Sequence, residues 1–265
     1  GSPFEMFVKD GIAVVFATGF SEENGNTYRQ ISKVYSISIE RPDKPELLKE
    51  TTMDGVIFDD RMVGDVVYVL ATVYPWMNWC GGDTTTQANQ GSVEALSLNI
   101  ADPSAPKVVE RLSLDKAGQA VYINQNFMYV ASSDYYWGDY ERQGSQVRIV
   151  DISDPNGHMR ERGSFQTAGW VQDRFKMNED GSVLAVASNT NYYWNGTTTF
   201  ETFDVSNPDQ PKRLAGLPIM ENESLQATRF EGRRAYIVTF RNTDPLFVVD
   251  WQNAAAPAVL GNLEI

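Results

Sequence analysis

The sequence predicts an all-β fold, a β-propeller of five four-stranded antiparallel blades, because one short turn recurs five times between strand-like segments. The turns lie at 41–45, 102–106, 154–158, 207–211 and 253–257, and their second positions are 61, 52, 53 and 46 residues apart. A repeat of about 50 residues with strand-like flanks is typical of β-propellers, in which each repeat forms one blade.

The first two strands of each unit are predicted from hairpin signals and from dense apolar composition. We expect strand A at 4–10, 55–63, 119–125, 170–178 and 225–232. Turns with Gly, Asn or Asp follow these segments, as in ordinary β-hairpins. Strand B is rich in Val, Ile, Tyr and Phe, so we expect it to be buried on both faces, at 12–19, 66–73, 127–134, 183–190 and 235–242.

The last two strands of each unit flank the recurring turn. Strand C alternates apolar and polar residues, as expected nearer the outside, at 34–40, 93–99, 147–153, 200–206 and 246–252. Pro fits the turn, and Asp or Asn side chains stabilise it by bonding to nearby backbone. Strand D is short and charged, which suits an outer edge, at 45–51, 106–114, 159–165, 211–219 and 257–265. No segment is predicted to be helical.

The repeat predicts a single domain over residues 3–265, with blades at about 3–53, 54–115, 116–167, 168–220 and 221–265. Gly1-Ser2 resembles a cloning scar. Five complete units are compatible either with a five-bladed ring or with part of a larger propeller, since propellers usually have 4 to 8 blades.

Composition excludes several functional classes. The formal net charge of −13 argues against nucleic-acid binding and against docking on anionic lipid, both of which need clustered Lys and Arg. No run of about 18 apolar residues occurs, so no membrane span is expected in this chain. The sequence also lacks a signal peptide, although a preceding export signal or lipid anchor could have been removed.

Cysteine and histidine are too rare for the common catalytic and metal centres. Cys80 is the single cysteine, and His158, the single histidine, lies in a turn of the repeat. A Cys–His pair, a Ser-His-Asp triad and a thiolate metal site are therefore not expected. Residues 178–182 resemble a fragment of a calcium loop but lack its 12-residue pattern, so we interpret them as a hairpin turn. We expect neither a cofactor nor a metal.

Three stretches resemble a family of secreted bacterial and archaeal β-propeller proteins. They are AYIVTFRNTDPLFVVD (235–250) within 229–265, QDRFKMNEDGSVLAVASNT (172–190), and residues 35–72. The third turn departs from the family pattern at Gly157-His158, and the fifth at Asn253-Ala254. The resemblance implies a propeller exported to the envelope or outside the cell: secreted, periplasmic or on the cell surface. It implies no known enzymatic activity and carries over no catalytic residue. Family members continue beyond the position of Ile265, so this chain could be a truncated member.

The connections between strands B and C are where the repeats differ most. Those of the second, third and fourth units are long and aromatic, and four of the six Trp residues lie in them. The candidate ligand-binding residues are Trp76, Trp79, Tyr135, Tyr136, Trp137, Tyr140, Tyr192, Tyr193 and Trp194. Trp and Tyr among Asn, Asp and Gly are typical of surfaces that stack on sugar rings or anchor a peptide. Alternatively, the aromatic side chains pack on one another and cap the ring.

Charged residues on strand A form a second candidate site. Arg61, Arg174 and Arg229 are predicted to take equivalent positions near the central channel, with Phe7 and Tyr122 completing the set. Asp60 and Asp173 precede two of the arginines. This pattern fits an anion or carboxylate site. It fits equally an arrangement in which Arg–Asp pairs join neighbouring blades.

These patterns favour a non-catalytic binding or scaffold propeller of the bacterial envelope or exterior, whose ligand is a glycan or a protein segment held by the aromatic loops. The alternative is a hydrolase or lyase with an Asp/Arg site at the channel mouth, although no nucleophile–base pair is visible. A third interpretation is a purely structural propeller. Ligand identity, enzymatic activity and oligomeric state are not determined by the sequence.

Overall fold

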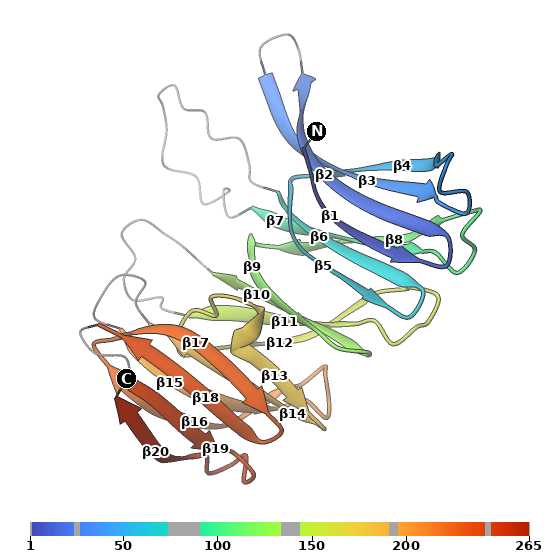
Figure 1. Cartoon of the computed structure of the whole chain (residues 1–265). Helices are drawn as coiled ribbons and strands as arrows, with labels where there is room; N and C mark the ends of the chain where they lie inside the picture. The colour runs from blue at the N-terminus through green and yellow to red at the C-terminus, as the bar shows by residue number, and fades with distance from the viewer. Residues whose placement is uncertain are drawn as a thin grey trace. The chain divides into compact units, whose positions relative to one another are not determined.

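The computed structural model describes residues 2–23, 27–73, 91–133, 144–190, 196–241 and 245–264. It contains five four-stranded antiparallel sheets, and within each sheet the strands follow one another in chain order (Figure 1). The predicted all-β class and the five four-stranded blades are therefore confirmed. We number the blades 1 to 5 along the chain.

The strands of the five blades have the following bounds. Blade 1 contains β1 (Ser2–Lys9), β2 (Ile12–Glu23), β3 (Thr27–Ser38) and β4 (Glu46–Asp54). Blade 2 contains β5 (Val56–Val63), β6 (Val66–Val73), β7 (Ser92–Asn99) and β8 (Lys107–Asp115). Blade 3 contains β9 (Gly118–Ile123), β10 (Phe127–Ser133), β11 (Ser145–Asp151) and β12 (Arg160–Gln166). Blade 4 contains β13 (Met177–Asp180), β14 (Val183–Asn189), β15 (Thr197–Asp204) and β16 (Lys212–Glu221). Blade 5 contains β17 (Ser224–Glu231), β18 (Arg234–Phe240), β19 (Pro245–Asp250) and β20 (Ala258–Glu264).

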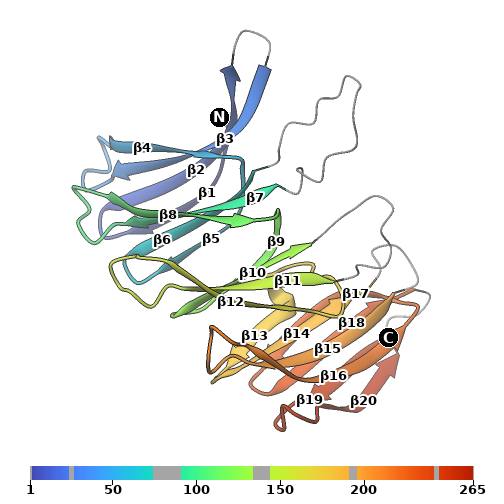
Figure 2. The same cartoon turned by 180° about the vertical axis from the view of Figure 1, so that it is seen from behind.

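The chain divides into two compact units, and each is described by itself. The first unit is Gly1–Gly118 with Asp151–Arg160, and it holds blades 1 and 2 together with the turn of blade 3. The second unit is Gln119–Val150 with Glu161–Ile265, and it holds most of blade 3 and all of blades 4 and 5. Figure 2 shows the same strands from behind.

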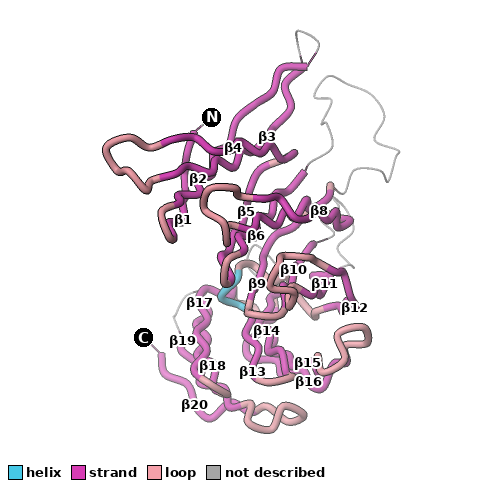
Figure 3. Tube along the Cα trace, turned by 90° about the vertical axis from the view of Figure 1, so that its right-hand side faces the viewer, coloured by secondary structure: helices cyan, strands magenta, loops and turns pink. Residues whose placement is uncertain are grey.

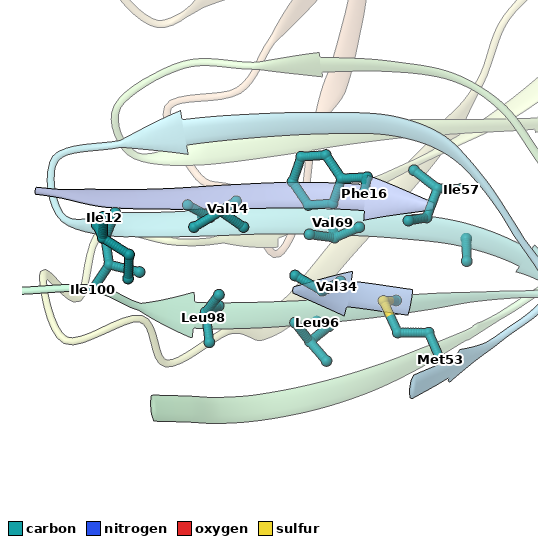
Figure 4. Packing of buried hydrophobic residues seen from close by; sticks show 12 residues of the cluster. Ile12, Val14, Phe16, Val34, Met53, Ile57, Val69, Leu96, Leu98 and Ile100 are labelled. Atoms are coloured by element: carbon teal, nitrogen blue, oxygen red, sulfur yellow. The ribbon is translucent and has the colours of Figure 1, made fainter. Parts of the chain in front are cut away.

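The core of the first unit lies between the facing sides of blades 1 and 2. Ile12, Val14 and Phe16 of β2 are at most 1% exposed and pack with Val67 and Val69 of β6 (Figure 4). In the second unit, one cluster joins blades 3 and 4, and another joins blade 4 to Ala235, Ile237, Val249 and Trp251 of blade 5. Apolar area removed from water between successive sheets thus stabilises each unit.

Strand A of blade 4 is shorter than predicted. Residues Arg174–Lys176 form a 3-10 helix, shown in cyan in Figure 3, and β13 begins only at Met177. The Asp173 carboxylate caps this turn by accepting from Phe175 N at 2.8 Å. The Lys176 side chain is 2% exposed, and its ammonium donates to Gln226 O at 3.0 Å and pairs with Asp173 at 3.2 Å. A local side-chain cap has replaced ladder pairing here.

The B–C connection of blade 1 is shorter than predicted, because strand B was expected to end at residue 19 and strand C to begin at residue 34. Strands β2 and β3 continue as a paired hairpin as far as Glu23 and Thr27, so each has 12 residues (Figure 1). The register is uninterrupted from Ile12↔Ser38 outward, which lets the ladder extend beyond β1 and β4. Phe20, on this hairpin, is 68% exposed.

Strand B is buried on both faces in the inner blades, as predicted. All seven residues of β14 are buried, and so are all but the last of β6. Strand C differs from the prediction, because six of eight positions in β15 are buried in sequence without alternation. The alternating pattern expected for strand C occurs in β19 of blade 5, where every second residue is buried. Strands whose two faces are both covered lose the alternation.

The recurring turns join strands C and D of one blade and also contact the preceding blade. In four turns an Asx side chain accepts a backbone N–H two residues on, as in Asp102 with Ser104 and Asn207 with Asp209. The turn of blade 4 lies on β12, where Gly163 N donates to Pro208 O at 2.8 Å and Arg162 forms two hydrogen bonds to Asp209. A side chain at Gly163 would collide with the turn, since its Cβ would lie 2.6 Å from Pro208 O.

The A–B hairpins are also joined by ion pairs, and the polarity of the pair reverses between the two units. In the first unit, Lys9 at the end of β1 pairs with Asp65 in the next hairpin turn. In the second unit, Asp180 at the end of β13 pairs with Arg233 in the next hairpin turn, with Nε–Oδ2 at 2.6 Å. The acid and the base have exchanged places at equivalent register positions.

Candidate functional site

All nine candidate aromatic residues lie outside the described part of the chain, in 74–90, 134–143 and 191–195. They are Trp76, Trp79, Tyr135, Tyr136, Trp137, Tyr140, Tyr192, Tyr193 and Trp194. Cys80 also lies there. The structure describes the strands from which these loops leave: β6 and β7, β10 and β11, and β14 and β15. Each loop joins the second strand of its blade to the third, as predicted.

A layer of buried polar side chains lies at this end of blades 3 and 4. Ser145, the first residue of β11, accepts from Val171 N at 3.0 Å through its hydroxyl. Thr167 donates to Gly169 O at 2.7 Å and accepts from Ser145 N at 3.0 Å. The Ser188 hydroxyl accepts from Gly169 N at 3.1 Å. Since buried polar groups cost free energy unless they are paired, these bonds fix the loop stems to the crossover between the blades.

Glu201 of β15 is the most deeply buried carboxylate in this layer, at 1% exposure. It accepts from Ala168 N at 2.7 Å and from Arg213 Nε at 2.8 Å. Burial raises the pKa of Glu201, while the hydrogen bonds from Ala168 and the Arg213 charge act in the opposite direction. The carboxylate therefore connects the crossover after blade 3 to the outer strand of blade 4.

The same device recurs in the first unit. Glu94 of β7 accepts from Asp54 N at 3.1 Å, at the crossover after blade 1, and pairs with Arg111 on β8. Ser32 matches Ser145, since its hydroxyl accepts from Ile57 N at 3.1 Å and donates to Gly55 O at 2.9 Å. A carboxylate on strand C and a Ser on the preceding strand C thus hold both crossovers.

The crossovers after blades 1 and 3 each contain a glycine that passes close to strand B of the next blade, β6 and β14 respectively. A Cβ on Gly55 would lie 2.2 Å from Thr72 O, and Gly55 has a φ of +84°. A Cβ on Gly169 would lie 2.4 Å from the carbonyl carbon of Asn189. Only a residue without a side chain fits such an approach.

The crossover after blade 4 uses different residues. Asn189, at the end of β14, donates through its amide to Thr198 Oγ1 at 2.9 Å and to Glu223 O at 2.8 Å. The buried Glu223 carboxylate accepts from the Thr239 hydroxyl on β18. The stem of the third aromatic loop is therefore tied to blade 5 as well as to blade 3.

The channel charges do not share one register position as predicted. In the strand register, Arg61 lies opposite Tyr68 and Arg229 lies opposite Tyr236, and both arginines stand two residues before the end of strand A. The residue at the same register position in blade 4 is Asn178. Arg174 lies four residues earlier, because the 3-10 turn shortens strand A. Arg61, Arg174 and Arg229 are exposed, and Asp60 is 6% exposed. Asp60 and Arg61 belong to the first unit and the other three to the second.

A half-buried carboxyl group that the sequence did not reveal joins blades 3 and 4 at the hairpin end. Glu179 accepts from Tyr129 Oη and from Asn124 Nδ2, both at 2.6 Å. Burial raises the pKa of Glu179 and also that of Tyr129, whose bond to the carboxylate acts in the same direction. Residues 178–182 form the β13–β14 hairpin, with Gly181 at a φ of +66°, as the hairpin interpretation predicts.

Neither a metal centre nor a membrane-spanning helix is found among the described residues. No group of three or more His, Cys, Asp or Glu side chains in these ranges is arranged to hold a metal ion. No helix among the same residues is long and apolar enough to cross a membrane.

The sequence profile of the family described as "Beta propeller domain" matches residues 1–105 and 83–265, which together span the whole chain. The chain belongs to the beta-propeller domain family. Within this propeller, the strand order of every blade agrees with that assignment.

Two archaeal relatives of the propeller are uncharacterised proteins. One, from Methanocaldococcus jannaschii, is 32% identical over 132 residues, which cover 49% of this chain and 20% of that protein. The other, from Archaeoglobus fulgidus, is 27% identical over 137 residues, which cover 50% of this chain and 21% of that protein. The alignments thus span about a fifth of each relative's length.

Solved structures resemble this propeller in fold alone. Hydrazine synthase of Kuenenia stuttgartiensis is 12% identical, with a TM-score of 0.50 over 94% of this chain and 62% of that chain. A structure described as an ACO/RPE65 chimera is 7% identical, with a TM-score of 0.50 over 96% of this chain and 58% of that chain.

We expect the stability of the propeller to depend on pH through Glu201. The folded-state pKa of this carboxyl is raised, so its contribution to the free energy of unfolding is fully present below the unfolded pKa of 4.5 and is lost as pH rises through the folded value. In Glu201→Gln this position no longer titrates. The free energy of unfolding of the wild type, minus that of Glu201→Gln, should therefore fall between pH 4 and pH 7 in urea titrations. A difference that is constant or rises with pH would contradict the raised pKa.

Proposed function

We propose that this chain is a non-catalytic binding or scaffold propeller of the bacterial envelope or exterior, which holds a glycan or a protein segment with its aromatic B–C loops. The observation that carries the proposal is the recurrence of Trp- and Tyr-rich loops at the same connection in blades 2, 3 and 4. Recurrence at the same connection of three blades favours a shared binding role over three unrelated loops.

The chemistry of these loops suits ligands with flat or ring-shaped apolar faces. Trp and Tyr provide large contact area with few rotatable bonds, and neighbouring Asn, Asp and Gly supply hydrogen bonds and close backbone approach. The stems supply rigidity, because Ser145, Ser188, Asn189 and Glu201 are at most 1% exposed and hydrogen-bonded beneath them. A preorganised platform lowers the entropy lost when a ligand binds.

The alternative hydrolase or lyase site is less favoured by the described contacts. Asp173 caps the 3-10 turn and pairs with Lys176, so its carboxylate already has a local structural role. The half-buried Glu179 needs no catalytic role to explain its position either, since its carboxyl group accepts hydrogen bonds from Tyr129 and Asn124. A position in the envelope or outside the cell follows the sequence resemblance to secreted propellers and forms part of the proposal.

The proposal is tested with the double variant Trp137→Ala/Trp194→Ala on glycan arrays and in pull-downs against envelope proteins. Loss of a central aromatic anchor typically costs about 2 kcal/mol or more, roughly a 30-fold loss of affinity. We expect a loss of at least that size for any ligand of the wild type. Phe175→Ala is the matched control, because Phe175 is an aromatic side chain with 62% exposure outside these loops. Unchanged binding by the double variant, or no ligand at all for the wild type, would contradict the proposal.

A further inference from the structure

We propose that the aromatic B–C loop of blade 2, residues 74–90, docks on the extended hairpin of blade 1. The docking surface is defined as Phe20 and Gln30, on the side of the hairpin that faces blade 2. The loop lies outside the described residues, and both segments belong to the first unit. The inference does not depend on the proposed ligand, because it concerns what supports this loop.

The strand register places Phe20 on the face of the hairpin that packs on blade 2. Pairing between β2 and β3 is uninterrupted over the whole length of both strands, so residues at every second position share one face. Ile12, Val14 and Phe16 lie on that face and pack with the core of blade 2 (Figure 4). Phe20 continues the same row, and Gln30 is its cross-strand partner.

The exposure along this row changes where the sheet of blade 2 ends. Phe16 is 0% exposed, whereas Phe20 is 68% exposed. On β3, Ser32 is 0% exposed and its hydroxyl donates to Gly55 O in the crossover. Gln30, the next residue on the same face of β3, is exposed. The docking surface thus continues an interface within the repeat, the one between blades 1 and 2.

Contacts at its base connect the docking surface to the stem of the loop. Gly55 N donates to Gln30 O at 3.0 Å. A Cβ on Gly55 would lie 2.2 Å from Thr72 O, so the crossover contacts both the hairpin and the end of β6. The loop leaves β6 after Val73 and returns at Gly91, whose Cβ position lies 2.8 Å from Val73 O. Both ends of the loop therefore lie beside the base of the hairpin.

The loop has the length and the composition to cover this surface. Half of the loop, fully extended, reaches about 25 Å, because an extended chain spans about 3.3 Å per residue. From Gly19 to the end of β2 the hairpin extends only about 13 Å at the usual strand rise. Trp76 and Trp79 follow the stem closely in the sequence. Aromatic side chains stabilise one another in offset or edge-to-face contacts, so Phe20 offers these residues a matching partner.

The thiol of Cys80, the single cysteine of the chain, belongs to this loop and reports its docking. The rate at which the native protein reacts with an aromatic disulfide reagent is measured. We expect Phe20→Ala to raise this rate roughly tenfold, which corresponds to about 1.4 kcal/mol in the equilibrium between docked and undocked loop. Ser21→Ala is the matched control and should leave the rate unchanged, because Ser21 lies on the opposite face of the same hairpin.

A double-variant cycle tests whether the loop is the occupant of the surface. Trp76→Ala/Trp79→Ala should raise the rate by a similar factor. Adding Phe20→Ala to these substitutions should raise it no further, since the contact is already lost. Circular dichroism and thermal melts check that every variant stays folded, as expected for a side chain that is 68% exposed to the described residues' surroundings.

Three results would overturn the proposal. The first is a rate in Phe20→Ala that equals the rate in the wild type or in Ser21→Ala. The second is a set of effects that multiply in the triple variant, because independent substitutions do not share a contact. The third is a wild-type thiol that reacts as fast in the native protein as in protein unfolded by urea.

Discussion

Replacing Gly55 with alanine is expected to lower the free energy of unfolding by roughly 3 kcal/mol or more. Gly55 has a φ of +84°, which disfavours any side chain by about 1 to 2 kcal/mol. Its new Cβ would also lie 2.2 Å from Thr72 O, so the crossover or β6 must shift and the Ser32 hydrogen bonds must change. Urea unfolding monitored by circular dichroism measures the loss.

Gly64→Ala is the control that separates backbone strain from the collision. Gly64 has a φ of +60°, but no atom lies within 4 Å of its Cβ position. It should therefore cost only about 1 kcal/mol. Equal losses at Gly55 and Gly64 would show that the close approach to Thr72 does not restrict the crossover.

Trp251→Ala is expected to cost about 3 to 5 kcal/mol, the usual range for removing a large buried aromatic side chain. Trp251 is 0% exposed, and its ring centroid lies 6.4 Å from that of Phe200 on blade 4. The Arg233 guanidinium lies over the same ring at 5.1 Å. The substitution therefore leaves a cavity between blades 4 and 5 and removes the support of the Arg233–Asp180 pair.

Two comparisons check the Trp251 prediction by thermal and urea unfolding. Trp251→Phe keeps most of the apolar volume and should recover part of the lost stability. Phe175→Ala removes an aromatic side chain that is 62% exposed and should change the free energy of unfolding by about 0.5 kcal/mol or less. A Trp251→Ala loss as small as that of Phe175→Ala would mean that the blade 4–blade 5 core is not built on this residue.

Much of the fold could be predicted because strand B and the Asx-Pro turns are signalled locally. The start of strand B was predicted correctly in blades 1 to 4, since dense β-branched residues follow a Gly- or Asn-containing hairpin turn. The 3-10 turn at Arg174–Lys176 could not be predicted, because it depends on a bond from Lys176 to Gln226, 50 residues away. The extended hairpin of blade 1 was missed because residues 19–31 have the polar composition of a loop.

The candidate site was only partly accessible to sequence reasoning. Length and aromatic content identify the B–C loops, because both depart from the repeat. The layer beneath them was missed, since Glu94 and Glu201 look like ordinary polar positions of an outer strand. The segment FETFDVS places Glu201 directly after Phe200, at the buried end of the strand. Only the hydrogen bonds to Ala168 and Arg213 show that this carboxylate belongs to the layer beneath the loops.

The reversed polarity of the hairpin ion pairs distinguishes the junction of blades 1 and 2 from the junction of blades 4 and 5. If blade 5 followed blade 1, Lys9 would face Arg233, and if blade 2 followed blade 4, Asp180 would face Asp65. Like charges at these points would oppose such misordered junctions even though the strands themselves are nearly interchangeable. At these two junctions, like charges would therefore disfavour the exchange of blades between chains during folding.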